Sequence, residues 1–373
     1  MTNTLGAMNR LKMLPFMRRG GTAPWFLPLI TALAIVLAGR WGLPTSFAEA
    51  LPTPPSQPSS GPGGSEDAHR SVRKSGSFGK GARAFYLYEP ADPAPATAPV
   101  IVFLHGYLGV NPTAYGAWIE HLVRRGNVVV YPVYQDSVIG AEHYSDDALA
   151  AVREAFRVLS SEADHVRPDP EGRWALVGHS LGGVIAANLA AAAEEEKLPR
   201  PRALMACNSG DANAVFKNIP SILRTPEKVP DLLLLVVAGE DDRLARDTAS
   251  RAIFDGCTGV QAANKNLIRL RSDRHGQPPL LADHFAPLAI DRSYDSGTSL
   301  RGGGQDRIRE MNGPNATDAL DFYGYWKWFD ALTDAAFFGK NRESALDDTH
   351  EQKFLGRWSD GRAVIEPEVV LGK

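Results

Sequence analysis

Between residues 173 and 195 the chain passes from an apolar run into an alanine-rich stretch through the pentapeptide GHSLG at 178–182. The apolar run predicts a strand and the alanine-rich stretch predicts a helix. Such a sharp reversal needs small residues at the bend, and Gly178 and Gly182 stand two positions before and after Ser180. The pattern G-x-S-x-G in this context predicts a strained turn that holds the Ser180 hydroxyl above the edge of a sheet.

Strand and helix patterns alternate along the rest of the chain. The runs VIVFL at 100–104 and DLLLLVVA at 231–238 are apolar throughout, which is typical of strands covered on both faces. The alternation predicts an α/β fold with a mainly parallel central sheet flanked by helices and no large cap domain. The predicted strands are 84–88, 100–104, 127–131, 173–177, 202–206, 231–238 and 266–270, and the predicted helices are 111–125, 145–159, 181–195, 243–254 and 315–338.

The first 50 residues differ from the rest. Basic residues precede an apolar run at 24–39 that is shorter than a membrane-spanning helix, and small residues follow it. We therefore expect 1–50 to be a signal peptide or N-terminal anchor, and the protein to be exported to the periplasm or secreted. Residues 51–70 are rich in Pro, Ser and Gly and predict a linker. The α/β domain is expected at 71–345, with a C-terminal tail at 346–373.

Charge and cysteine content exclude several classes of function. The formal net charge is −3, which gives no basic surface for nucleic acid. Two cysteines occur, Cys207 and Cys257, and the sequence leaves open whether they pair or stay as buried thiols. No Cys/His cluster suggests a zinc site, and no cofactor or metal is expected.

A serine becomes a strong nucleophile only beside a base that is oriented by a further group, and in this architecture the acid and then the histidine follow the serine along the chain. Three acids follow the strand at 231–238. Asp242 and Asp241 are the candidates, and Glu240 is the weakest. Two histidines follow the last predicted strand: His275, which is nearer to it, and His284.

The developing negative charge on a substrate oxygen needs backbone N–H donors. We assign the N–H groups of Tyr107, in the loop after 100–104, and Leu181, directly after Ser180. Gly106 allows the loop to turn toward the substrate. The side chain of His105 is expected to prop this loop, and His179 to line or underlie the pocket.

Four stretches together resemble the α/β-hydrolase superfamily, and more narrowly its dienelactone-hydrolase-like and chlorophyllase-like branch, which contains cutinase-like polyester hydrolases. In the cutinase-like enzymes a His-Phe-Ala-Pro run carries the base, so the resemblance assigns that role to His284, with His275 as the alternative. Similar hydrolases place the acid three residues after the glycine that follows the strand, so the resemblance favours Asp242 over Asp241. This sequence departs from the cutinase-like pattern at His179 and Leu181, where those enzymes often carry Trp and Met. The matching stretches lie at 100–133, 175–190 (ALVGHSLGGVIAANLA), 236–245 (VVAGEDDRLA) and 282–287 (ADHFAP).

These features predict a carboxylic ester hydrolase acting on a small-molecule or lipid-like ester through an acyl-enzyme on Ser180. An acyltransferase or peptidase with the same residues, or a non-catalytic binding module on this scaffold, are the alternatives. The polar segment 276–314 is expected to be a mobile flap over the site or a surface excursion. The aromatic residues of 315–338 favour packing against the sheet over a substrate platform.

Overall fold

The computed structural model describes residues 50–215, 220–300 and 317–373. The expected signal peptide or anchor at 1–50 therefore lies, apart from Ala50, outside the described residues. Ala50–Lys373 forms one compact unit. Among the described residues, none of the helices is both long and apolar enough to span a bilayer.

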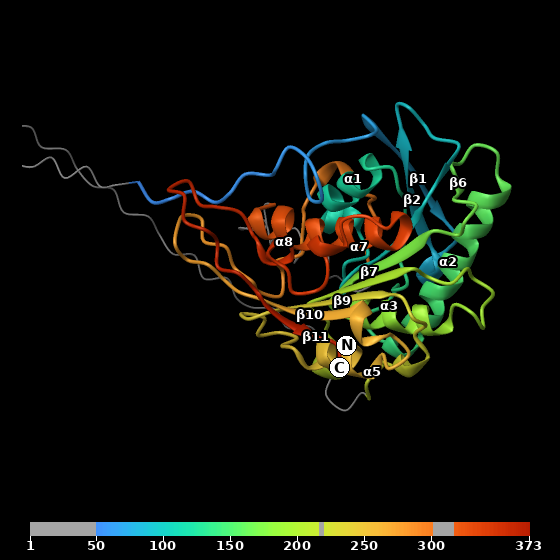
Figure 1. The fold of residues 1–373 in the computed structure, drawn as a ribbon. Coiled ribbons are helices and arrows are strands. Elements are labelled where there is room, and N and C mark those ends of the chain that lie inside the picture. The colour runs from blue at the N-terminus through green and yellow to red at the C-terminus, as the bar shows by residue number, and fades with distance from the viewer. Residues whose placement is uncertain (1–49, 216–219, 301–316) are drawn as a thin grey trace, which may run out of the picture. The chain divides into compact units, whose positions relative to one another are not determined.

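The centre of this unit is a nine-stranded sheet in the order β1-β2-β5-β4-β7-β8-β9-β10-β11 (Figure 1). The run from β5 to β10 is parallel, whereas β1, β2 and β11 pair antiparallel at the two edges. A further pair, β3 with β6, stands apart. The strands are β1 (Ser71–Phe78), β2 (Phe85–Ala91), β3 (Thr97–Ala98), β4 (Val100–Leu104), β5 (Val128–Pro132), β6 (Arg167–Pro168), β7 (Trp174–His179), β8 (Ala203–Cys207), β9 (Leu233–Gly239), β10 (Lys265–Leu270) and β11 (Glu368–Leu371).

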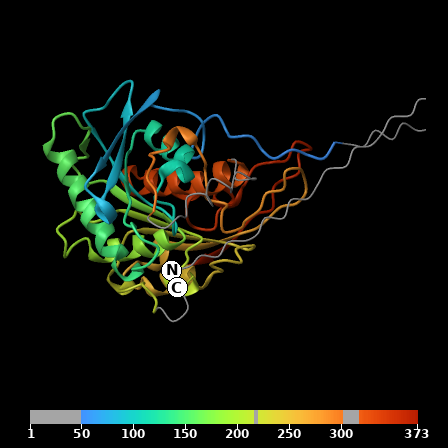
Figure 2. The same cartoon turned by 180° about the vertical axis from the view of Figure 1, so that it is seen from behind.

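Helices cover both faces of the sheet, and the view from behind in Figure 2 shows the same layers. One face packs against α1 and α7, and the other packs against α2, α3 and α5. Within β4, alternate side chains supply the two cores: Ile101 and Phe103 to the first, Val100 and Val102 to the second. The helices are α1 (Gly116–Arg124), α2 (Tyr144–Ser161), α3 (Leu181–Ala192), α4 (Ala212–Val215), α5 (Thr248–Gly256), α7 (Trp326–Phe338) and α8 (His350–Lys353).

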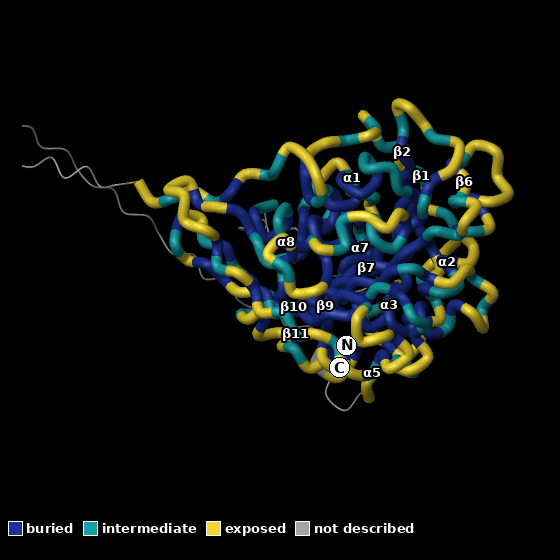
Figure 3. The backbone as a smooth tube through the Cα atoms, viewed as in Figure 1, coloured by how far each residue is buried: buried dark blue, intermediate teal, exposed yellow. Residues whose placement is uncertain are grey.

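The predicted fold class is confirmed, and all the predicted strands are present within a few residues. The continuous apolar runs became central strands because both of their faces are covered, as the buried tube in Figure 3 shows. The aromatic segment also behaves as expected, because Trp328 and Phe329 are fully buried in the core beside α1. A turn of π-helix at Asp321–Tyr325 stands directly before α7.

Both expected flanking segments belong to the compact unit. In the expected linker 51–70, Gly63 N–H donates to Asp330 Oδ2 at 2.8 Å, and Ala68 N–H donates to the carbonyl oxygen of Arg124 at 3.0 Å. In the expected tail 346–373, β11 pairs with β10 and closes one edge of the sheet. A segment poor in apolar residues can pack through its backbone donors, which composition does not reveal.

The two cysteines are both free and buried. Cys207 lies in the core on one face of the sheet and Cys257 in the core on the other. The alternative of two buried thiols therefore describes the structure. Burial raises the pKa of the Cys257 thiol to about 12.

Only part of the expected flap, 276–314, falls within the described residues. There, Ala289 exchanges backbone hydrogen bonds with Ala114 and Ala117 at 3.0 Å, and Asp291 N–H donates to the carbonyl oxygen of Thr113. Residues 276–300 thus include a stretch fixed to the start of α1. Residues 301–316 lie outside the described residues, so the mobile flap stays a prediction.

Candidate active site

The predicted strand–turn–helix is present: β7 ends at His179, α3 begins at Leu181, and Ser180 joins them with φ 54° and ψ −123°. A positive φ is costly for a side chain with a Cβ, so the surroundings must hold it. Ser180 N–H donates to the carbonyl oxygen of Cys207 at 2.9 Å, and its own carbonyl accepts from Gly183 N–H at 3.0 Å. These bonds stabilise the strained turn.

The glycines of the pentapeptide are sterically required. A Cβ on Gly178 would stand 2.2 Å from the carbonyl oxygen of Gly182. A Cβ on Gly182 would stand 2.2 Å from the carbonyl oxygen of Leu104, at the end of β4. Any side chain at either position would therefore push the turn off the sheet.

The structure brings Ser180, His284 and Asp242 together in one hydrogen-bonded row. Ser180 Oγ lies 3.0 Å from His284 Nε2, and His284 Nδ1 lies 2.8 Å from Asp242 Oδ2. Because a carboxylate only accepts, Nδ1–H donates to Asp242, which leaves Nε2 of the neutral ring to accept from the hydroxyl. All three residues are buried, with relative exposures of 8%, 5% and 4% for Ser180, His284 and Asp242.

Asp242 is held as a carboxylate in this row. Its second oxygen, Oδ1, accepts from the backbone N–H groups of Leu244 at 3.0 Å and Ala245 at 2.8 Å. Burial acts to raise the pKa of Asp242, but the bond and charge of His284 and these two N–H groups outweigh it, so the pKa lies below its ordinary value. The same turn explains why α5 begins at Thr248 rather than at the predicted residue 243.

The alternative residues lie in a neighbouring polar cluster instead. Asp241 Oδ2 accepts from Ser272 Oγ at 2.7 Å and from Arg274 at 2.6 Å. His275 Nε2 lies 2.6 Å from Asp360 Oδ2, in the C-terminal segment. Their contacts tie the loop after β10 to the end of the chain rather than to Ser180.

The loop after β4 runs close to the serine. A Cβ on Gly106 would stand 3.3 Å from Ser180 Cβ, so this position leaves little room for a side chain. The Gly106 carbonyl oxygen accepts from Gly109 N–H at 2.8 Å. Because C=O and N–H point in opposite directions across a trans peptide, this bond also fixes the direction of Tyr107 N–H. The N–H of Leu181 belongs to the first turn of α3, where amides have no partner within the helix.

A second row of hydrogen bonds joins this loop to the loop that carries His284. His179 Nε2 lies 2.8 Å from the carbonyl oxygen of His284, and His179 Nδ1 lies 2.8 Å from the hydroxyl of Tyr115. The Tyr115 oxygen in turn accepts from Gly106 N–H at 2.9 Å. Burial, with the nearby His284, lowers the pKa of His179 to about 3, so the ring is neutral. Its Nε2–H donates to the carbonyl and its Nδ1 accepts from the tyrosine.

Sequence reasoning missed Tyr115 altogether and placed His179 only in general terms beside the pocket. Nothing in the pattern around Tyr115 marks it, because its partners stand 9 and 64 residues away. His105 is buried and stacks on Tyr134 with ring centroids 4.0 Å apart, while its Nε2 lies 2.8 Å from the carbonyl oxygen of Val133. These contacts fit the expectation that it props the loop.

A family model described as alpha/beta hydrolase fold matches residues 101–252. The match runs from β4 into α5 and includes Ser180 and Asp242, while His284 lies beyond it. None of the curated proteins compared with the chain matches it. The match and the sheet topology together show that the protein has the α/β-hydrolase fold and support its place in that superfamily. The narrower dienelactone-hydrolase-like and cutinase-like branch stays a prediction.

Proposed function

We propose that the protein is a serine hydrolase that cleaves carboxylic esters through an acyl-enzyme on Ser180. The observation that carries the proposal is the row Ser180–His284–Asp242, with links of 3.0 and 2.8 Å. A hydroxyl, an imidazole and a buried carboxylate in this order are the arrangement of nucleophilic acyl transfer. The family match to the α/β-hydrolase fold is consistent with it.

In the first half of the reaction, Ser180 Oγ attacks the ester carbonyl carbon and its proton passes to His284 Nε2. The imidazolium is then stabilised by the Asp242 carboxylate, 2.8 Å from Nδ1. The negative carbonyl oxygen is bound by the N–H groups of Tyr107 and Leu181, each donor contributing about 3 kcal/mol. The carbon–oxygen bond to the alcohol breaks, and His284 gives its proton to the leaving oxygen.

In the second half, water takes the place of the alcohol. His284 removes a proton from this water, and the oxygen attacks the acyl carbon. The bond to Ser180 Oγ breaks, and His284 returns the proton to the serine. The products are the carboxylic acid, the alcohol and the free enzyme.

The test is turnover of p-nitrophenyl esters of increasing chain length by the wild type and by Ser180→Ala. Ser160→Ala, at an exposed position on α2, is the matched control. We expect turnover by the wild type and the control, and a loss of at least about 10³-fold in Ser180→Ala. Unchanged turnover in Ser180→Ala would reject the proposal. Product analysis with added alcohols or amines then separates a hydrolase from an acyltransferase or a peptidase.

We also propose that the chain is exported, on the basic, apolar and small-residue order of 1–50. Cell fractionation followed by N-terminal sequencing tests this. We expect the protein outside the cytoplasm and beginning after Ala48 or Ala50. An intact N-terminus in the cytoplasmic fraction would contradict it.

A further inference from the structure

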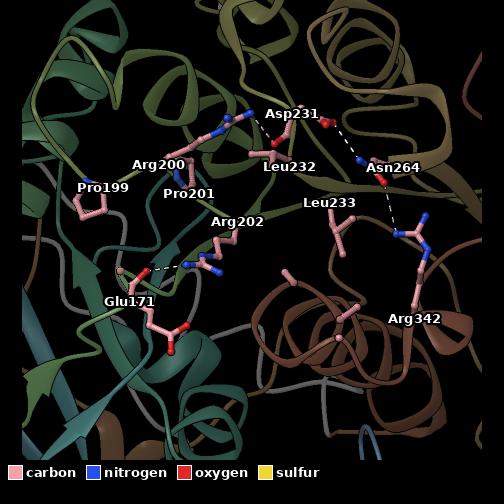
Figure 4. A pocket seen from close by; sticks show the side chains of 14 residues that line it. Glu171, Pro199, Arg200, Pro201, Arg202, Asp231, Leu232, Leu233, Asn264 and Arg342 are labelled. Carbon is pink, nitrogen blue, oxygen red and sulfur yellow. Dashed lines mark hydrogen bonds between the residues drawn. The ribbon is translucent and has the colours of Figure 1, made fainter.

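We propose that the hollow at the amino-terminal ends of β7–β10 is a second ligand site, which binds a carboxylate that carries an apolar body. The hollow has a volume of about 620 Å³, a size typical of small-molecule sites. Figure 4 shows its lining residues from close by. The inference does not depend on the chemistry of Ser180.

The hollow lies at the opposite edge of the sheet from Ser180. Four of its lining residues precede or begin parallel strands: Glu171 comes before β7, Arg202 before β8, Leu233 begins β9, and Asn264 comes before β10. Ser180, by contrast, follows the last residue of β7. The six residues of β7, at about 3.3 Å each, separate the two sites by roughly 20 Å.

Three arginines line the hollow: Arg342 is paired with Asp347 at 3.0 Å, whereas Arg200 and Arg202 have donors to spare. Arg200 donates through one terminal nitrogen to the carbonyl oxygen of Asp231 at 2.9 Å, and Arg202 donates likewise to the carbonyl oxygen of Glu171 at 2.7 Å (Figure 4). A guanidinium has five N–H donors. Among the described residues, no carboxylate forms an ion pair with either of them. Both therefore keep free donors and positive charge at the hollow.

The neighbouring acids are already engaged. Glu171 Oε2 pairs with Arg173 at 2.7 Å, and the same guanidinium pairs with Asp169 at 3.0 Å. The Asp231 carboxylate accepts from Gln261 and from Asn264 Nδ2. Burial acts to raise the pKa of Asp231, but these bonds and the charge of Arg200 outweigh it and lower the pKa, so the group is an anion that partly offsets Arg200. Among the described residues, none of these carboxylates is bonded to Arg202, so the free donors of its guanidinium are available to one carboxylate.

Part of the lining is apolar, which gives the ligand its second property. Pro201 and Leu232 are buried, and Leu233, Ala335 and Ala336 are partly exposed in the hollow. An apolar body laid on these side chains loses water-exposed surface on both partners. The carboxyl end of α7 also faces the hollow and would repel an anion, but Gly339 N–H, Lys340 N–H and Arg173 Nε already bind carbonyl oxygens of its last turn.

The test measures the binding of octanoate to the full chain by titration calorimetry. The titration is done with the free protein and again after Ser180 has been blocked with a fluorophosphonate. Octanol is the uncharged comparison ligand. The variants are Arg202→Met, Arg200→Met and Ala335→Trp, which fills the hollow. Arg153→Met, an exposed arginine of α2 paired with Glu196, is the matched control, and the melting temperature of each variant checks folding.

We expect saturable octanoate binding that is unchanged by the blocked serine and by Arg153→Met. Arg202→Met is expected to weaken it about tenfold or more, and Arg200→Met by less. Octanol should bind at least about tenfold more weakly than octanoate, and Ala335→Trp should abolish binding. The inference is overturned if octanoate does not saturate, if blocking Ser180 removes binding, or if both arginine variants bind as the wild type does. A chain that binds octanoate but fails to react with the fluorophosphonate would reject only the proposed function.

Discussion

The Nε2–H of His179 donates to the backbone carbonyl of His284 at 2.8 Å, so the residue beside the proposed nucleophile holds the loop that carries the proposed base. Through Tyr115 the same imidazole is linked to Gly106, which precedes the proposed oxyanion donor Tyr107. One buried row of hydrogen bonds therefore holds the loop of His284, the turn at His179 and the loop of Gly106 at fixed distances from one another. We expect the loss of this row to lower kcat.

Removing the tyrosine hydroxyl breaks this row at its centre. Tyr115→Phe leaves Gly106 N–H without its acceptor and His179 Nδ1 without its donor. We expect kcat to fall about 10- to 100-fold with little change in KM, since a lost buried bond costs about 1–3 kcal/mol and the groups affected act on the transition state. Steady-state kinetics of Tyr323→Phe, a partly buried tyrosine in the segment before α7, should match the wild type. A rise in KM alone would show that Tyr115 serves only binding.

The two candidate acids and the two candidate histidines allow the assigned catalytic residue to be compared with its alternative in the same protein. In Asp242→Asn the amide oxygen can keep the N–H bonds of Leu244 and Ala245, so an NH2 group replaces the carboxylate oxygen that accepts from His284 Nδ1–H. The ring then takes the wrong tautomer, and kcat should fall about 10³- to 10⁴-fold, as in related triads. Asp241→Asn loses only its bonds to Ser272 and Arg274 and should change kcat by less than about threefold. The same contrast is expected between His284→Ala and His275→Ala. Equal losses within either pair would contradict the assignment.

A buried carboxyl pair makes stability depend on pH. Burial and the neighbouring Asp318 raise the pKa of Asp321 well above its ordinary value, and burial raises the pKa of Asp318 to about 6. Groups with a raised folded-state pKa stabilise the fold most below their unfolded pKa, and this contribution is lost as pH rises through the folded pKa. Among the described residues, Asp321 Oδ1 has no hydrogen-bond partner that would offset the charge.

Asp321→Asn removes this titration. Relative to the wild type, its melting temperature should rise by at least about 2 °C between pH 5 and pH 9. Asp164→Asn, at an exposed position after α2, should follow the wild type across the range. If the difference between Asp321→Asn and the wild type were flat or fell with rising pH, the carboxyl would be ionised in the fold.

The two cysteine thiols should not react with thiol reagents until the protein unfolds. Because Cys207 and Cys257 lie on opposite faces of the sheet, each buried, they cannot pair without unfolding. A thiol reagent should react with neither in the native protein and with both in denaturant, and a reductant should leave the melting temperature unchanged. A drop in melting temperature under reductant would indicate a disulfide.

Local patterns predicted the fold well because central strands such as β4 and β9 are apolar on both faces and the turn at Ser180 needs its glycines. The edge strands β1 and β11 were not predicted, because a polar strand and a very short strand both lack a continuous apolar run. The sequence limited the main candidates for the acid to Asp241 and Asp242, and those for the base to His275 and His284. Which of each pair reaches Ser180 depends on how the turn after β9 and the loop after β10 fold back. The link between His179, Tyr115 and Gly106 is purely tertiary and has no local pattern.

Mass spectrometry of the protein after reaction with a fluorophosphonate tests most directly whether Ser180 is the nucleophile. We expect one adduct per chain, on Ser180, formed by the wild type and strongly slowed in His284→Ala. No adduct, or an adduct on another residue with Ser180 unmodified, would contradict this role of Ser180.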